Sequence, residues 1–226
     1  MRRAIAAEAV GSGLLFATVI GSGVMGDTLS GGNVAVALLG NTLATGAMLY
    51  VLITMFGPIS GAHFNPAVTL VFRLLGTLGT RQALAHFAAQ IAGGLVGVWI
   101  AHAMFGLDIL QFSAKARTGP GQWTSEVVAT FGLVLTILGT LRHRPQSVPT
   151  AVALYITAAY WFTSSTSFAN PAITLARSLS NTFAGIAPAD APAFIACQFA
   201  GAVLALATAR ALFPEADLAK DATADA

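Results

Sequence analysis

Charged residues are scarce in this chain. They make up 9% of its 226 residues, whereas a soluble domain carries about 25%. Apolar residues account for 56% of the chain, and the mean hydropathy is +0.75. A soluble protein with so little charge would not stay dispersed in water. The composition therefore indicates a polytopic membrane protein.

Cysteine and the usual signals of catalysis or nucleic-acid binding are also missing. The single Cys197 excludes an internal disulfide and leaves the redox compartment open. With a net charge of +2 and no basic tract, the chain gives no indication of a nucleic-acid partner. No nucleophile–base pair or metal-ligand spacing is visible, so we expect neither an enzyme nor a cofactor nor a bound metal. His86, His102 and His143 share no ligand spacing with cysteine or acidic residues.

Six apolar stretches are each long enough to cross a hydrocarbon core about 30 Å thick. The first stretch, with Arg2 and Arg3 ahead of it, has some features of a signal peptide. Against that interpretation, Glu8 interrupts the apolar run and no clear cleavage site follows. The predicted spans are residues 4–24, 33–56, 82–105, 124–141, 148–165 and 190–213.

The distribution of lysine and arginine predicts the orientation in the membrane. With the N-terminus in the cytoplasm, eight of the eleven basic residues lie inside. Lys115, Arg117 and Arg177 then lie outside, and the positive-inside rule favours this arrangement. Six spans return the C-terminus to the cytoplasm. We expect the polar loop 106–122 to face outward and the polar tail 214–226 to be mobile.

One tripeptide, Asn-Pro-Ala, occurs twice, each time after an apolar stretch and before a short apolar run. Asparagine is a good helix cap and proline suits the first helical position, so each copy predicts a helix start. Short helices that begin at matching places in two halves indicate a pore or binding site at the membrane midplane. The copies are Asn65-Pro66-Ala67 and Asn170-Pro171-Ala172.

The two halves of the chain are similar to each other. Leu-Tyr-Val and Leu-Tyr-Ile stand at equal distances before the two Asn-Pro-Ala copies, and the other similarities follow in the same order. Each half holds three predicted spans, an odd number, so the halves cross the membrane in opposite senses as an inverted repeat. The matching segments are 7–10 with 125–128, 49–51 with 154–156, and 89–93 with 197–201.

The segment 60–69, Ser-Gly-Ala-His-Phe-Asn-Pro-Ala-Val-Thr, resembles the first signature of the major intrinsic proteins, the aquaporins and aquaglyceroporins. The early glutamate, the second Asn-Pro-Ala and the two Gln-x-x-Gly segments are similar to that family as well. The resemblance implies an all-α membrane protein with six transmembrane helices and two re-entrant half-helices in an inverted 3+3 repeat. It also implies a single channel domain over 1–213, with repeats at about 4–105 and 124–213, assembled as a homotetramer in a bacterial inner membrane.

The half-helices would meet N-terminus to N-terminus, and each terminus carries roughly half an elementary positive charge. Together they would oppose cations in mid-pore. The amides of Asn65 and Asn170 could donate hydrogen bonds to a neutral solute. Exposed carbonyls at membrane depth are tolerated only beside water, and we expect them to line the pore. The expected pore-lining carbonyls belong to Gly61, Ala62, His63, Thr166, Ser167 and Phe168.

Glu8 and Glu126 lie within predicted spans, where ionisable groups are costly and usually functional. A proton relay would make the protein a transporter. The alternative, which the resemblance favours, is structural: each carboxylate accepts hydrogen bonds from non-helical backbone before an Asn-Pro-Ala. We interpret His63 as a hydrogen-bonding residue that fixes the same loop.

The second signature departs from the family, because Ile173 stands where most members have arginine. Counting back from each Asn-Pro-Ala, the four positions of the family's outer constriction fall on Thr45, Ala158, Ser167 and Ile173. This set is small and neutral, which argues against strict selection for water. The segment 170–186 resembles a bacterial branch of the family associated with arsenic resistance.

Three functions remain open at this stage. The first is a passive channel for small uncharged solutes: arsenous acid and related arsenicals, glycerol-like polyols, and water. The others are a water-selective channel and an ion- or proton-coupled secondary transporter. Arg177, one turn beyond Ile173, is either an interfacial arginine that reaches water or a charge at the outer mouth that partly replaces the missing arginine.

Overall fold

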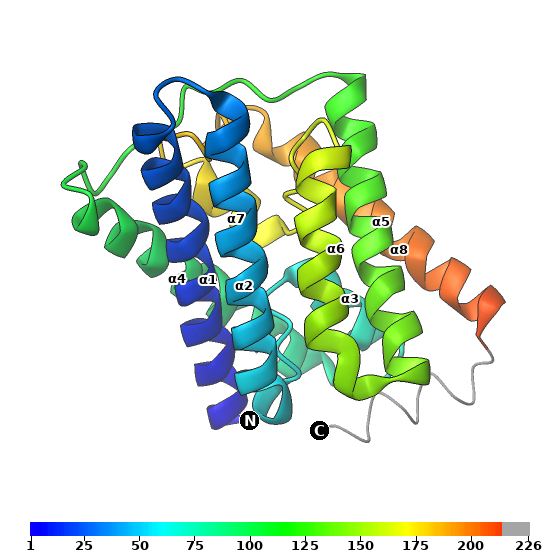
Figure 1. Ribbon diagram of the computed structural model, residues 1–226. Helices are drawn as coiled ribbons and strands as arrows, with labels where there is room; N and C mark the ends of the chain where they lie inside the picture. The colour runs from blue at the N-terminus through cyan, green and yellow to red at the C-terminus, as the bar shows by residue number, and fades with distance from the viewer. Residues whose placement is uncertain (214–226) are drawn as a thin grey trace.

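The computed structural model describes residues 1–213, and over those residues it consists of helices and loops alone. Two short helices, α3 (Pro66–Leu74) and α7 (Pro171–Arg177), lie in the middle of a bundle of longer helices (Figure 1). The predicted tail 214–226 lies outside the described residues. The longer helices are α1 (Arg2–Leu29), α2 (Val34–Ser60), α4 (Thr80–Met104), α5 (Pro120–His143), α6 (Val148–Phe162) and α8 (Ala191–Leu212).

Five of the six long helices have the length and apolarity needed to cross a membrane. The sixth, α6, has only 15 residues and rises about 22 Å at ~1.5 Å per residue. The 3₁₀ turn Pro145–Ser147 precedes it directly and adds about 6 Å at ~2.0 Å per residue. The span predicted over 148–165 is therefore right in position but too long, because the backbone leaves the helix after Phe162.

Asparagine side chains start both short helices, as the sequence predicts. Asn65 Oδ1 accepts a hydrogen bond from Ala67 N at 2.9 Å, and Asn170 Oδ1 accepts one from Ala172 N at 3.0 Å. Proline follows each asparagine at the first helical position, where a missing N–H has no consequence. The two half-helices therefore have the same local design.

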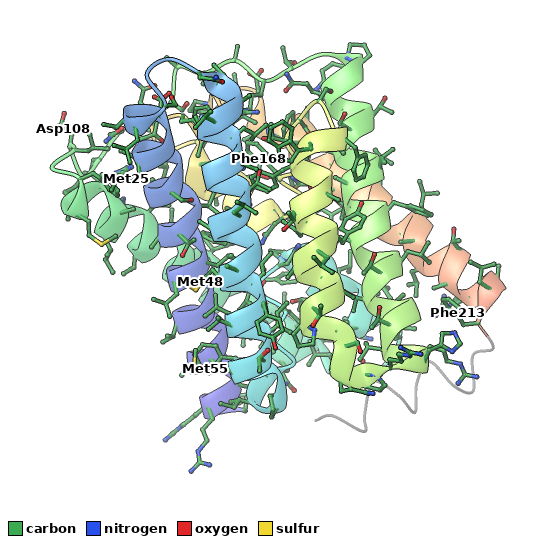
Figure 2. The ribbon with its side chains drawn as sticks, viewed as in Figure 1. Met25, Met48, Met55, Asp108, Phe168 and Phe213 are labelled. Carbon is green, nitrogen blue, oxygen red and sulfur yellow. The ribbon has the colours of Figure 1, made fainter. Side chains whose placement is uncertain are left out.

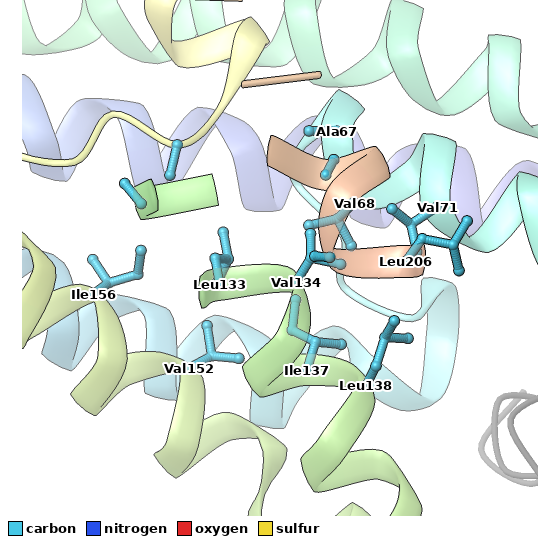
Figure 3. Packing of buried hydrophobic residues seen from close by; sticks show 14 of the residues in the cluster. Ala67, Val68, Val71, Leu133, Val134, Ile137, Leu138, Val152, Ile156 and Leu206 are labelled. Atoms are coloured by element: carbon cyan, nitrogen blue, oxygen red, sulfur yellow. The ribbon is translucent and has the colours of Figure 1, made fainter. Parts of the chain in front are cut away.

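The apolar core has two parts, and each half-helix packs with helices of the other repeat. Val68 and Val71 of α3 pack against Val134 of α5 and Leu206 of α8, in the cluster drawn in Figure 3. Ile173 and Ala176 of α7 belong to a second cluster with α1 and α4. This exchange joins the two repeats into one bundle.

Glycines allow the long helices of each repeat to approach closely. A Cβ on Gly97 of α4 would lie 2.0 Å from the carbonyl oxygen of Gly13 in α1. In the second repeat, a Cβ on Gly201 of α8 would lie 2.4 Å from the carbonyl oxygen of Val127 in α5. A side chain at either position would separate the helices that frame the centre of the bundle.

Candidate functional site: a cavity between the two short helices

A cavity of about 1140 Å³ runs through the middle of the bundle. Met1, Gln82 and Gln146 line it at the face where α1 begins, which is called the N-terminal face below. Tyr160 and Arg177 line it toward the opposite face, which carries the loop 106–119 and is called the loop face (Figure 1). Both Asn65 and Asn170 line the cavity between these ends.

The two asparagines are fixed to each other's repeat. Asn65 Nδ2 donates to the carbonyl oxygen of Ala169 at 2.7 Å, and Asn170 Nδ2 donates to that of Phe64 at 2.8 Å. An amide nitrogen carries two protons, so each asparagine keeps one for another acceptor. The arrangement holds the N-termini of α3 and α7 together while both side chains still face the cavity.

The backbone before each asparagine adopts left-handed conformations that non-glycine residues rarely occupy. Ala62 and Phe64 have φ of 48° and 47°, and Ser167 and Ala169 have φ of 49° and 48°. Such strain persists only where the surroundings fix it, and it is typical of functional segments. Here it turns the backbone of both loops toward the cavity.

The carboxylates of Glu8 and Glu126 hold these strained segments. Glu8 accepts hydrogen bonds from the backbone N–H groups of His63 and Phe64 at 2.9 and 2.7 Å. Glu126 accepts the equivalent bonds from Phe168 and Ala169, both at 2.9 Å. Both glutamates are completely buried. This is the geometry of the structural alternative, in which each carboxylate satisfies non-helical backbone.

A glutamine supports the buried glutamate by a hydrogen bond in each repeat. Gln90 Nε2 donates to Glu8 at 2.7 Å and to Thr69 Oγ1 at 2.9 Å. Gln198 Nε2 donates to Glu126 at 2.6 Å and to Thr174 Oγ1 at 2.8 Å. In the sequence these glutamines appear only as part of the resemblance between the repeats and to the family. Their matching places in the two repeats were the signal that they belong to the site.

Five of the six residues expected to offer pore-lining carbonyls do line the cavity. Thr166 is the exception: it is half-buried, and its N–H turns back to the carbonyl of Thr163 at 3.1 Å. His63 lines the cavity, and its Nδ1 lies 3.0 Å from Thr69 Oγ1, which fits its expected role in fixing the loop.

Three of the four residues expected at the outer constriction line the cavity. Thr45, Ser167 and Ile173 all line the cavity. Ala158 does not, because it is exposed on the outer face of α6 beside Leu154. That prediction is wrong: counting back from Asn170 assumed the family's spacing, and here the face of α6 that borders the cavity carries other residues.

Tyr160 takes the place expected for Ala158. It is buried, lines the cavity, and its hydroxyl donates to Thr45 Oγ1 at 3.4 Å. A phenol ring therefore borders this end of the cavity, where the sequence predicted the small side chain of Ala158. The pattern of exposure along α6 reveals it, because Val152, Ile156 and Tyr160 are buried at four-residue intervals.

Arg177 is buried, with 2% of its surface exposed, and it lines the cavity. Its Cζ lies 3.3 Å from the centre of the Phe168 ring, and its Nε donates to the carbonyl of Ala184. Phe168 lies in the upper part of the bundle in Figure 2. Helical side chains point back toward their own N-terminus, so Arg177 reaches the segment before Asn170. Arg177 therefore lies inside the bundle beside the cavity and not on its outer surface.

The cavity is lined by residues that carry amide protons, carbonyl oxygens, hydroxyls and one guanidinium. Within residues 1–213, no three histidine, cysteine or acidic side chains come together as metal ligands. The arrangement therefore suits recognition of a small polar molecule by hydrogen bonds. Both strained loops and both half-helix termini contribute to it.

Comparison with known proteins gives a family match over most of the chain. The model of the major intrinsic protein family matches residues 1–164. Aquaglyceroporin AqpS of Rhizobium meliloti (strain 1021) is 56% identical over 216 residues, which cover 96% of this chain and 92% of that protein. The lens fiber major intrinsic protein of Gallus gallus is 33% identical over 161 residues, or 67% of this chain and 58% of that protein.

Among solved structures, the X-ray structure of the aquaglyceroporin from Plasmodium falciparum superposes with a TM-score of 0.75. The match covers 96% of this chain and 99% of that chain at 18% sequence identity. It shows the same fold: long helices around two short helices that meet in the middle.

Proposed function

This chain belongs to the major intrinsic protein family, and from that premise we propose that it is a passive membrane channel for small uncharged solutes. One observation carries the proposal. Asn65 and Asn170 line one cavity, are locked together by reciprocal hydrogen bonds, and each keep a free amide proton for a solute. A channel family of this kind has no reaction to catalyse, so we assign no enzyme activity and no cofactor.

The N-termini of α3 and α7 explain why the proposed channel excludes cations. α3 and α7 both begin at the middle of the cavity, and each N-terminus carries roughly half a positive charge. Both partial charges face the same cavity, so their effects on a passing ion add. A cation would meet this barrier after losing most of its hydration shell.

The solutes we propose are arsenous acid and related arsenicals, glycerol-like polyols, and water. Ile173 replaces a guanidinium with an apolar side chain at the constriction, while Thr45 and Ser167 supply hydroxyls. Small polyhydroxy solutes need apolar surface on one side and hydrogen-bond partners on the other. The name aquaglyceroporin, carried by the relative that is 56% identical, agrees with this class of solute.

A water-selective channel is the second candidate, because Tyr160 and Arg177 both border the cavity at the loop-face end. An aromatic ring and a guanidinium there could narrow the passage more than the sequence predicts. The two candidates differ in the flux of glycerol relative to that of water.

A coupled transporter is disfavoured by the state of the two buried acids. Glu8 and Glu126 are each occupied by at least three hydrogen-bond donors. All of these donors belong to the loops before the Asn-Pro-Ala copies or to the supporting glutamines, so both acids are tied to the protein scaffold. A proton relay needs an acid that releases and regains its proton during each cycle.

We further propose that the protein is a homotetramer in a bacterial inner membrane with both termini in the cytoplasm. The bias of lysine and arginine supports the orientation. The N-terminal face is then the cytoplasmic mouth, and the loop face, with Arg177 as the charge at the outer mouth, is the external mouth.

The test is swelling of proteoliposomes in parallel gradients of water, glycerol and arsenous acid. The proposal predicts that all three fluxes exceed those of empty liposomes. Water flux without glycerol or arsenous acid flux would instead support the water-selective channel.

A further inference from the structure

Two buried arginines lie on the same aromatic ring at the loop-face end of the cavity. The Cζ atom of Arg177 lies 3.3 Å from the centre of the Phe168 ring, and that of Arg117 lies 5.1 Å from it. Arg117 is 7% exposed and Arg177 is 2% exposed. Within residues 1–213 neither guanidinium forms an ion pair with a carboxylate; both donate to backbone carbonyls. Burying two cations without a directly paired carboxylate is costly unless something else uses their charge.

Two side chains at this end of the cavity keep hydrogen-bonding atoms without a protein partner. Nε of Arg177 donates to Ala184, and in the described chain its terminal nitrogens make no further hydrogen bond. The hydroxyl of Ser167 is buried and has no hydrogen-bond partner among residues 1–213. Both residues line the cavity and flank Phe168, one in sequence and one in space. Buried polar groups normally have partners, so these two point to a ligand.

We propose that Arg177 and Ser167 form a binding subsite for a small monovalent oxyanion, and that Arg117 is the residue that positions Arg177 in it. A guanidinium presents parallel N–H groups that match two oxygen atoms of a planar oxyanion. The serine hydroxyl can donate a further hydrogen bond. This proposal rests on the channel function proposed above. It adds that the outer mouth of the channel binds small oxyanions in preference to spherical anions.

Arg117 does not line the cavity, so it acts through other residues. Its Nε donates to the carbonyl of Gly185 at 2.8 Å, and its Nη1 donates to that of Ser165 at 3.2 Å. Ser165 precedes the second Asn-Pro-Ala, and Gly185 follows α7 next to Ala184, which accepts from Arg177. Arg117 therefore bridges the segments on either side of Arg177. Burial lowers the pKa of Arg117 to about 10, which leaves it charged at neutral pH.

The loop 106–119 holds this bridge in place. Ser113 N donates to the carbonyl of Ser178 at 3.0 Å, and Ala187 N donates to the carbonyl of Lys115 at 2.7 Å. The backbone N–H of Arg117 itself donates to the carboxylate of Asp190 at 2.8 Å. These bonds attach the loop to the segment between α7 and α8 on both sides of Gly185. The direction of the Arg177 side chain is thus set from outside the cavity.

The test uses nitrate as the oxyanion and chloride as the spherical control, in proteoliposomes of the full chain at pH 7. Glycerol-driven swelling is measured against rising sodium nitrate or sodium chloride at equal osmolarity. The subsite predicts saturable inhibition of glycerol flux by nitrate and little by chloride. Equal effects of the two anions on the wild-type protein would overturn the proposal.

Four variants separate the subsite from a general effect of charge. In Arg177→Gln the half-inhibiting nitrate concentration should rise about tenfold, the typical loss for one charge-assisted contact. Ser167→Ala should raise it several-fold. Arg117→Gln should raise it nearly as much as Arg177→Gln, and Arg117→Lys should recover part of the loss by keeping one of the two hydrogen bonds.

Lys115→Gln is the matched control, because it removes one positive charge from the same loop without contact with Phe168. It should change nitrate inhibition by less than about twofold. An effect equal to that of Arg117→Gln would mean that only the summed charge matters, and would overturn the positioning role. Water flux is measured for every variant, since a wild-type protein without water or glycerol flux would instead refute the channel function.

Discussion

The carboxylates of Glu8 and Glu126 illustrate how single residues hold this channel in shape. Each satisfies two backbone N–H groups in a strained segment before an Asn-Pro-Ala, and a glutamine supports each from a neighbouring helix. The acids are therefore part of the support of the pore. At the scale of the residue, the charge matters because it accepts several hydrogen bonds at once.

Glu8→Gln and Glu126→Gln should each lower the stability of the folded protein by about 1–3 kcal/mol, because an amide leaves at least one buried donor unsatisfied. Detergent-solubilised protein should show a lower melting temperature, while the remaining flux stays independent of a proton gradient. Asp27→Asn, at an exposed carboxylate, is the matched control. Normal stability with flux that loses its gradient dependence would support a proton relay instead.

Ile173→Arg restores the residue that most family members carry at this position. Ile173 is buried and lines the cavity one turn before Arg177, so a second guanidinium would both fill space and repel the first. Glycerol flux should fall at least about tenfold more than water flux. An unchanged ratio of glycerol to water flux in proteoliposomes would show that Ile173 is not at the constriction.

Lys115 predicts a small dependence of stability on pH. Its partial burial, followed by the charges of Arg117 and Arg177, lowers its pKa to about 8. Because the folded state disfavours the charged form, stability should rise as the pH increases from below 8 toward the ordinary lysine pKa near 10.5. The difference in melting temperature between wild type and Lys115→Met should change across this range. A difference that shrinks to zero or reverses below pH 8 would contradict this assignment.

The sequence predicted the residues of the site where local chemistry determines them. Asn65 and Asn170 cap helices through their own side chains, so the motif alone reveals them. Tyr160 and Arg117 were missed because their roles depend on distant parts of the chain. Tyr160, and not Ala158, lies on the face of α6 that borders the cavity, and the packing of α6 decides which face this is. Arg117 donates hydrogen bonds to Ser165 and Gly185, which are far from it in the sequence.

At the scale of the element, the helices follow from composition and their ends follow from special residues. The five long apolar helices and the two half-helices lie where the sequence places them. α6 is shorter than predicted, because the backbone leaves the helix at Thr163 and continues into the strained segment that contains Thr166 and Ser167. Hydropathy reports burial in lipid or protein, and it does not distinguish helix from a buried loop held by Glu126.

Close packing of α1 on α4 gives a prediction at this scale. Gly97→Ala would place a Cβ 2.0 Å from the Gly13 carbonyl oxygen, so the helices must separate. The cost should be about 1–3 kcal/mol, the usual penalty of overpacking. Gly40→Ala in α2 is the matched control, because its Cβ would meet no atom within 4 Å. Equal melting temperatures for the two variants would contradict this account of the helix contact.

At the scale of the whole molecule, the inverted repeat is preserved in structure but differs in chemistry. The first repeat places His63 edge-to-face against His86, with ring centres 5.7 Å apart at 70°. The second places Phe168 against Phe194 at the equivalent positions, 5.2 Å apart at 77°. The duplication could be read from the sequence. The packing of each half-helix against helices of the other repeat could not be read from the sequence, because it depends on how the repeats face each other.

The most direct test of the central claim is glycerol flux through the purified protein in liposomes, measured over a wide range of glycerol gradients with and without a proton gradient. A passive channel predicts flux that rises in proportion to the gradient and does not change when a protonophore dissipates the proton gradient. Flux that saturates with glycerol concentration and stops when the proton gradient collapses would contradict the channel and favour a coupled transporter.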